Sequence, residues 1–170
     1  MHKPLAAMSL VLLLSALPCA AAPAESTPAV RAESPALIAF KKAIRAKYNM
    51  KEKAFAAHDA ETILTRFYAE DAFSVGEGFG IFNGRKELRP LYEQAVNEYT
   101  VKVTSMHTYV NGNAGWDWAD FYVMPVDPKE KPFMLAILFL WSKSGGEWMC
   151  KGDFYVKGSF KTGKLASPTD

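Results

Sequence analysis

The fold is decided by a stretch that opens Phe55-Ala-Ala-His58-Asp59-Ala-Glu61-Thr-Ile63-Leu64-Thr-Arg-Phe67-Tyr68-Ala-Glu70-Asp71-Ala72 and ends at Val96. A loop broken by glycines follows this opening, and Asn83-Gly84-Arg85 then starts another helix. Helices precede a run of strands, and this order is typical of a small cone-shaped α+β domain. A cone of this kind contains a pocket. The sequence therefore predicts a ligand-binding pocket, but it does not identify the ligand.

Working back from that stretch, the sequence predicts a long first helix. Ser34 is a good N-cap, and Pro35 suits the first helical position. One apolar stripe recurs at helical spacing and carries the pattern to about Ala57. Its members are Leu37, Phe40, Ile44, Tyr48 and Phe55.

Two shorter helices are predicted next. Asp59 is the expected N-cap of a helix that runs through Tyr68. Gly76, Gly78 and Gly80 break the following loop into irregular or short extended pieces. A third helix follows Gly84, although Pro90 lacks the N–H that a helix interior uses, so a loose first turn or a bend is expected.

Strands are predicted over residues 99–110, 114–126, 133–141 and 147–156, with Asn111-Gly112 as a hairpin turn. Residues 133–141 are continuously apolar, as in a central strand covered on both faces. An antiparallel meander normally leaves one face wet. The pattern therefore predicts helices on one side of the sheet and a second subunit on the other, which makes the protein a homodimer.

The termini predict export. Residues 1–24 resemble a signal peptide, with an apolar stretch too short to span a bilayer and a small-residue cleavage site. Residues 25–34 are expected to form a flexible leader, 35–159 the folded domain and 160–170 a disordered tail. The protein is then periplasmic or secreted, with no membrane association after cleavage. Cys19 leaves with the signal, and Cys150 is expected to be a buried structural thiol.

Charge and motif content exclude several function classes. The net charge is +2 and no basic run is interleaved with aromatics, so nucleic acid is not expected as a partner. His58 and His107 lack paired ligand spacing, so no metal is predicted. No phosphate-binding glycine loop or nucleophile elbow occurs, so no cofactor is predicted either.

The arrangement resembles the nuclear transport factor 2-like superfamily, and most closely its SnoaL-like branch. The resemblance rests on the segment Phe67-Tyr68-Ala69-Glu70-Asp71-Ala72, the helix start Asn83-Gly84-Arg85, and Gly146-Glu147-Trp148 before the last strand. It covers roughly residues 35–159. It implies three amino-terminal helices packed on a curved, mostly antiparallel sheet that encloses a pocket. This fold hosts isomerases, dehydratases, cyclases, hydrolases and non-catalytic binders, so it does not name an activity.

Ketosteroid isomerases, which share this resemblance, use a carboxylate base, a tyrosine and a protonated acid. Alignment by the motifs puts the base at Gly76, next to Glu77. It puts the tyrosine at Lys51, with Tyr48 nearly one turn away, and the acid at Leu138. None of the three positions carries the required group, so steroid isomerisation by that mechanism is not expected.

Three residues remain as catalytic candidates. His107 shares a strand face with Val101 and Val103, and it is either a general base in the pocket or an ordinary strand histidine. Asp120 shares a face with aromatics, which either desolvate it for acid–base work or line a dimer interface. Asp153 lies either on a solvated face beside Lys151 or, like a late acid of SnoaL-like cyclases, inside the cone.

Two hypotheses for function follow. The first is an exported protein that binds a small hydrophobic molecule without catalysis. The second is a cofactor-free acid–base isomerase, dehydratase or cyclase acting on a small hydrophobic substrate. The candidate ligand-binding residues are mostly aromatic: Tyr48, Phe67, Glu77, Trp116, Trp118, Tyr122 and Trp141.

Overall fold

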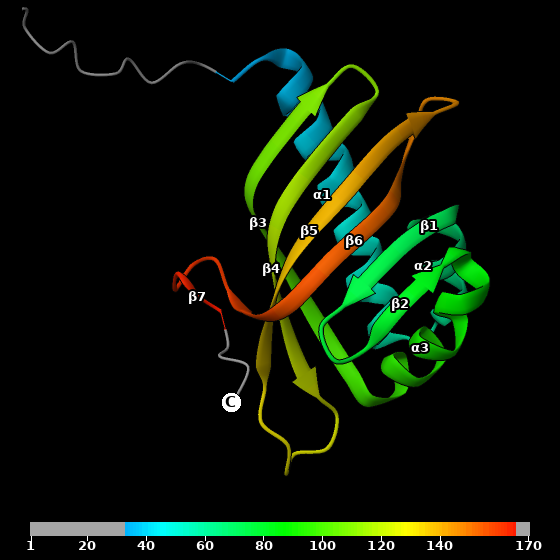
Figure 1. Cartoon of the computed structure of the whole chain (residues 1–170), viewed down its shortest axis with the longest axis vertical. Helices are drawn as coiled ribbons and strands as arrows, with labels where there is room; N and C mark the ends of the chain where they lie inside the picture. The colour runs from blue at the N-terminus through cyan, green and yellow to red at the C-terminus, as the bar shows by residue number, and fades with distance from the viewer. Residues whose placement is uncertain (1–32, 166–170) are drawn as a thin grey trace, which may run out of the picture. The chain divides into compact units, whose positions relative to one another are not determined.

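A computed structural model describes residues 33–165 and shows three helices and a curved, unclosed sheet (Figure 1). The helices are α1 (Pro35–Ala56), α2 (Ala60–Arg66) and α3 (Gly84–Glu98). The strands are β1 (Tyr68–Gly76), β2 (Gly80–Asn83), β3 (Tyr99–Asn111), β4 (Ala114–Pro125), β5 (Phe133–Ser144), β6 (Glu147–Ser159) and β7 (Lys164–Leu165). The predicted α+β class is confirmed. Among the described residues, no helix has the length and apolar character needed to cross a membrane.

The sheet is antiparallel except at one junction. Its order is β2-β1-β6-β5-β4-β3, with β7 paired to the side of β6. β1 runs parallel to β6, and every other pair is antiparallel. Because β1 follows α2, the parallel junction brings the helical part of the chain beside its last long strand.

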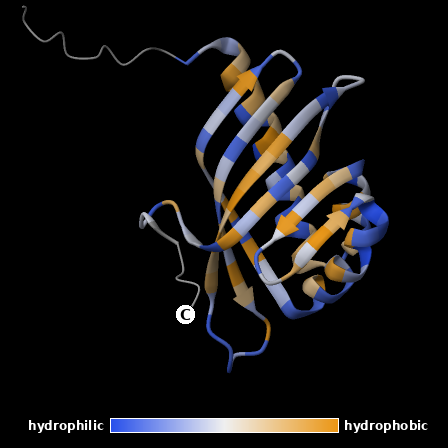
Figure 2. Ribbon diagram, viewed as in Figure 1, coloured by the Kyte–Doolittle hydropathy of each residue, from blue (hydrophilic) through white to orange (hydrophobic). Residues whose placement is uncertain are grey.

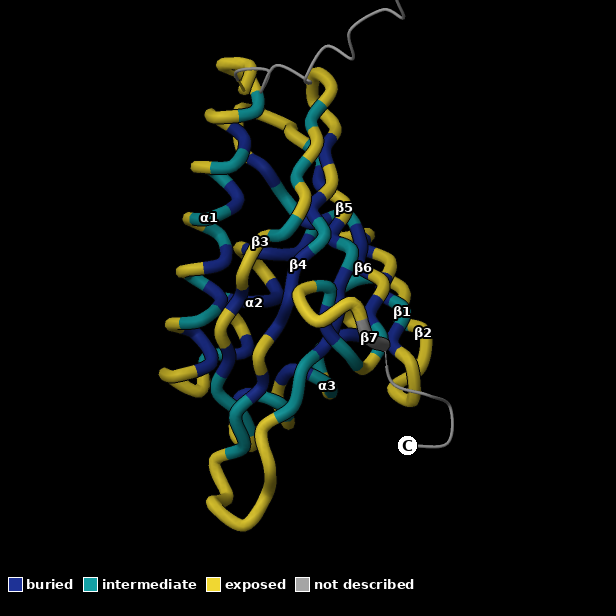
Figure 3. The backbone as a smooth tube through the Cα atoms, turned by 90° about the vertical axis from the view of Figure 1, so that its left-hand side faces the viewer, coloured by how far each residue is buried: buried dark blue, intermediate teal, exposed yellow. Residues whose placement is uncertain are grey.

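The caps and the apolar stripe of α1 form as the sequence predicts. Ser34 Oγ accepts a hydrogen bond from the Leu37 amide at 3.2 Å. The outer edge of α1 is exposed, and the side toward the sheet is buried (Figure 3). Phe40 packs so closely on Gly115 that a Cβ there would lie 2.5 Å from its ring, so the helix can lie against β4 only where that side chain is missing.

The second helix is shorter than expected. Asp59 caps it, accepting from the Thr62 amide at 2.9 Å, but it ends at Arg66 rather than Tyr68. The carbonyl of Phe67 accepts a hydrogen bond from the Cys150 amide at 2.9 Å. Strand pairing with β6 therefore begins where the helix was predicted to continue. The glycine-rich segment after it forms the β1–β2 hairpin, and α3 runs through Pro90 without interruption.

Two β-bulges change which residues face inward. The register of β3 against β4 shifts between Ser105 and His107, so His107 does not share the buried face of Val101 and Val103 as predicted. The register of β6 against β5 shifts at Lys151, because Trp141 pairs with Cys150 and Leu140 pairs with Gly152. Cys150 and Asp153 are consequently both buried, although strict alternation assigned them to opposite faces.

Within a single chain, the outer face of the apolar strand β5 is buried at Ala136 but exposed at Leu140. Its long hydrophobic stretch is visible in Figure 2. Phe139 and Trp141 are buried under the helices, whereas Leu140 is 47% exposed on the outer face. The predicted helices cover the inner face, whereas nothing in residues 33–165 lies over the outer side of β5 at Leu140, so the predicted cover by a second subunit stays a prediction.

The carboxyl-terminal segment is ordered further than expected. Phe160–Gly163 form a turn, and β7 then pairs with Gly158 and Ser159 of β6. The predicted signal peptide and all but the last two residues of the predicted leader lie outside the described residues, as do residues 166–170 of the predicted tail.

Candidate functional site

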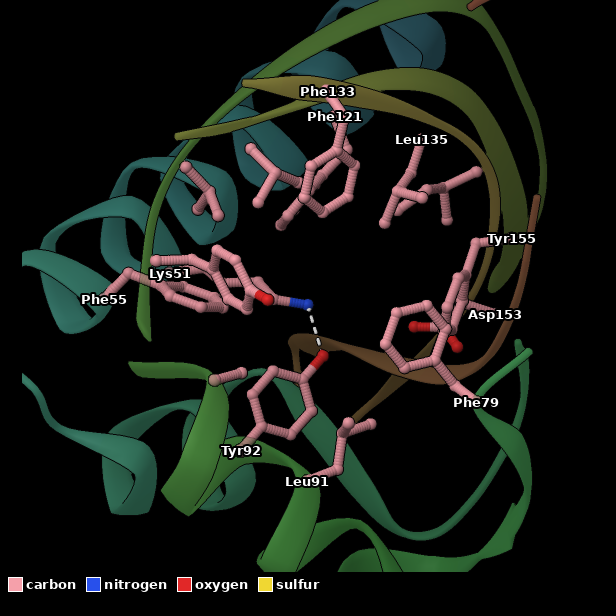
Figure 4. A pocket seen from close by; sticks show the side chains of 15 residues that line it. Lys51, Phe55, Phe79, Leu91, Tyr92, Phe121, Phe133, Leu135, Asp153 and Tyr155 are labelled. Carbon is pink, nitrogen blue, oxygen red and sulfur yellow. Dashed lines mark hydrogen bonds between the residues drawn. The ribbon is translucent and has the colours of Figure 1, made fainter. Parts of the chain in front are cut away.

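A cavity of about 90 Å³ lies between the helices and the inner face of the sheet. That is several times the roughly 10–15 Å³ that one water needs, so a small organic molecule or part of a larger one can enter. Apolar side chains make up most of its wall (Figure 4). The lining residues are Lys51, Phe55, Phe79, Leu91, Tyr92, Ala95, Tyr99, Val101, Phe121, Val123, Phe133, Leu135, Ile137, Asp153 and Tyr155.

Lys51 is the cation of this cavity. It continues the inward stripe of α1, three residues after Tyr48, and is only 2% exposed. Its Nζ donates to the Tyr92 hydroxyl at 2.9 Å and to the Tyr68 hydroxyl at 3.2 Å. It also lies 4.2 Å from the centroid of the Phe67 ring. Burial lowers the pKa of Lys51 to about 8, although the charge of Asp153 acts in the opposite direction.

A chain of hydroxyl groups joins Lys51 to Asp153. The Tyr92 and Tyr68 hydroxyls are 2.6 Å apart, and the Tyr68 hydroxyl donates to Asp153 Oδ2 at 2.5 Å. Ser74 donates to the other oxygen of Asp153, also at 2.5 Å. α1, α3, β1 and β6 each supply a member, so the tertiary fold rather than any local motif assembles the chain.

Asp153 is buried at the β6 wall of the cavity, 5% exposed. Burial raises its pKa, against the opposing effects of the Lys51 charge and of the hydrogen bonds from Ser74 and Tyr68. Burial also raises the pKa values of Tyr68 and Tyr92 well above the ordinary value for tyrosine. The same desolvation therefore favours a neutral amine, neutral phenols and a protonated acid, which lets a proton be shared along the chain.

The cavity rim near β1 depends on a glycine. A Cβ on Gly76 would lie 2.2 Å from the Tyr155 ring, so this ring occupies the space where a side chain would stand. Phe79, in the turn after β1, packs on Tyr155 with ring centroids 5.6 Å apart. Phe79 is also 45% exposed, which places it between the cavity and solvent.

Of the three predicted catalytic residues, the structure brings only Asp153 into this cavity. His107 lies on the outer side of the sheet, in a surface hollow with Tyr109, Trp118 and Phe160. Asp120 is buried but accepts hydrogen bonds from the Ser159 hydroxyl at 2.6 Å and the Phe160 amide at 2.7 Å. Its position is explained by the turn that it holds after β6, away from Lys51 and Asp153.

The predicted ligand-binding residues fall outside the cavity lining. Tyr48, on the inner face of α1, packs in the core with Phe67 and Trp141. The Tyr48 hydroxyl donates to Asp117 at 2.8 Å, so it satisfies a second buried carboxylate. The remaining candidates lie elsewhere: Trp116, Trp118 and Tyr122 on the outer sheet face, and Glu77 as an acceptor for the Lys157 amide at 3.1 Å.

Sequence reasoning missed Lys51, Tyr68, Tyr92 and Tyr155. A usable indication existed for Lys51, which stands three residues after Tyr48 and four before Phe55 on an otherwise apolar stripe. A lysine at that spacing is directed into the core. No comparable indication existed for Tyr155, whose inward direction depends on the bulge at Lys151.

The site offers hydrogen-bond donation and proton transfer. Lys51 can donate to an acceptor oxygen in the cavity, and Asp153 can exchange a proton with it through Tyr68 and Tyr92. Within residues 33–165, no group of three histidine, cysteine, aspartate or glutamate side chains is placed to hold a metal ion.

Solved structures of several proteins share this fold. An NTF2-like protein of unknown function from Pseudomonas putida superimposes with a TM-score of 0.62 at 14% identity, covering 77% of this chain and 96% of its own. A protein of unknown function from Mycobacterium tuberculosis gives 0.63 at 17% identity, covering 74% and 76%. LinA gives 0.59 at 14% identity, covering 72% and 88%. No family model and no curated protein matches the chain. The predicted NTF2-like fold is confirmed, and at these identities the likeness concerns the fold alone.

Proposed function

We propose that this NTF2-like domain binds a small, mostly apolar molecule that carries an oxygen acceptor, and that Lys51 holds this oxygen. The observation that carries the proposal is a single buried amine at the wall of an otherwise largely apolar cavity. Ligand sites commonly combine an apolar lining with a few polar groups that fix orientation. An apolar molecule without an acceptor oxygen would offer Lys51 no hydrogen bond beyond those that it already donates to Tyr68 and Tyr92.

A short amide tests this proposal, because it offers a carbonyl oxygen, fits a small cavity and does not react with amines. Butyramide titrated into the protein is expected to shift NMR resonances of cavity residues, with a dissociation constant of roughly millimolar order for so small a ligand. Lys51→Met should weaken binding by about tenfold, since a hydrogen bond to a charged donor is lost. Lys53→Met, an exposed change two residues along the same helix, should leave the affinity unchanged. Equal affinities for wild type and Lys51→Met would remove Lys51 from the site.

A second candidate is a cofactor-free acid–base enzyme, an isomerase, dehydratase or cyclase. The connection from Lys51 through Tyr92 and Tyr68 to Asp153 favours it, because a binder needs no route for protons. Asp153→Asn tests it: a turnover that survives this change, with any substrate found for the protein, would exclude Asp153 as the acid or base.

Export and dimerisation belong to the same proposal. The amino-terminal sequence supports a periplasmic or secreted location. A homodimer through the outer sheet face is supported by the exposed side chains of Trp116, Leu140 and Phe154 on adjacent strands.

A further inference from the structure

We propose that Lys51 captures small apolar aldehydes covalently, by forming a reversible imine inside the cavity. This inference rests on the proposed function, since the aldehyde must first enter the cavity with its oxygen toward Lys51. It goes further because it assigns to Lys51 a bond-forming role and names the chemical class of the ligand.

The amine of Lys51 is placed where a ligand in the cavity can reach it. Lys51 Nζ lies at the cavity wall, directed toward the Tyr92 hydroxyl that faces it from α3 (Figure 4). The long side chain is held by burial along the inner face of α1, so few rotamers remain to be lost when a ligand is bound. A lysine that is desolvated in an apolar pocket is one of the recognised ways to make an amine nucleophilic at neutral pH.

The ionisation state of Lys51 supports the same conclusion. With a pKa of about 8, roughly a tenth of the Lys51 population is the neutral amine at pH 7, and about half is neutral at pH 8. An exposed lysine, with its ordinary pKa near ~10.4, is almost entirely protonated there. The buried amine is therefore the more reactive one, even though exposed lysines meet the aldehyde more often.

The reaction balances with the groups present. The Nζ lone pair attacks the carbonyl carbon and forms a C–N bond, while the carbonyl oxygen takes a proton from Tyr92. Tyr92 is reprotonated by one of the two amine protons, which gives a carbinolamine. The second amine proton then moves to this oxygen, the C–O bond breaks and water leaves. The C=N bond remains, and no oxidant or reductant is consumed.

The surroundings favour this outcome. The leaving water departs from a cavity with mostly apolar walls, which disfavours the reverse hydrolysis. Tyr92 is within hydrogen-bond distance of Nζ, so it can move both protons without a bulk-water relay. Asp153 and Tyr68 can rebalance the charge of an intermediate iminium through the same hydrogen bonds.

Borohydride trapping of butanal tests the inference on the whole protein. After incubation near neutral pH, sodium borohydride converts any imine into a stable butylamine, and peptide mass mapping locates it. We expect labelling at Lys51 to exceed that at Lys53, the exposed comparator on the same helix, by at least about tenfold. Tyr92→Phe should slow labelling of Lys51 about tenfold or more while leaving Lys53 unchanged.

Lys51 labelling no greater than Lys53 labelling would overturn the inference. Butyramide binding then shows whether only the covalent step fails or the proposed binding function fails as well. If butyramide still binds wild-type protein more tightly than Lys51→Met, only the covalent step is wrong. If it shows no such preference, the proposed function falls as well. Suppression of Lys51 labelling by excess butyramide, with Lys53 unaffected, would place the reaction in the cavity and support both.

Discussion

Lys51 shows what one polar residue on an apolar helix face can do. Its neighbours on the stripe, Tyr48 and Phe55, direct it inward, and the aromatic rings around it partly replace the water that it loses. This compensation is incomplete, because desolvation still lowers the pKa of the amine. The result is an amine whose ionisation changes near neutral pH, as in many functional lysines.

The pH dependence of labelling follows from this pKa. Deprotonation creates the nucleophile, so the initial rate at Lys51 should rise with pH, reach half its maximum near pH 8 and then level off. The ionisable groups that face Lys51 are Tyr68 from β1, Tyr92 from α3, and Cys150 and Asp153 from β6. Borohydride quenching at a fixed short time, over a pH series, measures the profile. A rate at Lys51 that keeps rising to pH ~10, like that of an exposed lysine, would contradict the lowered pKa.

The close approach of Tyr155 to Gly76 leads to a prediction about stability. Gly76→Ala should destabilise the protein by about 1–3 kcal/mol, because its Cβ and the Tyr155 ring would need the same space. Urea unfolding measures the loss. In a Tyr155→Leu background the same substitution should cost much less, and an equal cost in both backgrounds would show that Tyr155 is not the obstacle.

Only part of the site is predictable at the level of single residues. Asp153 is one of the three catalytic candidates that the sequence indicates, and its inward position is one of two alternatives. Alignment by motifs reaches Lys51 only as a position where the tyrosine of the ketosteroid isomerases is missing. The sequence predicts Tyr68 in a helix, and its role depends on contacts with α1, α3 and β6 that no short stretch of sequence specifies.

At the element scale, the order of helices and strands was predictable because caps, stripes and turns are local. Ser34, Asp59 and Asn111-Gly112 act through neighbours only a few residues away. The bulges at Ser105–His107 and at Lys151 were not predictable, because a strand with one extra residue still has the residue types of an ordinary strand. After each bulge, the side chains of the strand point to the face opposite to the one that strict alternation predicts. His107 therefore points outward and Asp153 inward.

The role of Asp120 is structural rather than catalytic. It joins β4 to the turn after β6 by accepting from Ser159, Phe160 and Lys161. Asp120→Asn keeps the shape but replaces one acceptor oxygen by a donor. We expect a loss of about 1–3 kcal/mol in unfolding free energy and faster amide exchange at Phe160 and Lys161, with butyramide affinity unchanged. A lost affinity with an intact turn would instead place Asp120 in the binding machinery.

At the scale of the whole molecule, the sheet separates two surfaces with different roles. The inner face and the helices enclose the cavity. The outer face presents Tyr109, Trp116 and Leu140 in one cross-strand row, and Leu138 beside Phe154 in the next. A hydrophobic outer face was predictable from the apolar run at residues 133–141. The curvature that leaves room for a cavity on the inner face was expected only through the family resemblance.

The outer face makes the prediction for assembly. Leu140→Lys places a charge at the centre of this face and should convert a dimer into a monomer, as measured by light scattering at micromolar concentration. Ile38→Lys is the matched control, since Ile38 is at least as exposed as Leu140 but lies on α1. A wild-type protein that is monomeric at that concentration would show that the exposed aromatics do not form a stable interface.

A crystal structure of the protein soaked with butyramide would show whether Lys51 holds the oxygen of a small molecule inside the cavity. We expect density for the amide among the lining residues, with its carbonyl oxygen within hydrogen-bond distance of Lys51 Nζ and its propyl group toward Phe121 and Leu135. An unoccupied cavity under saturating butyramide, or an amide whose oxygen is turned away from Lys51, would contradict it.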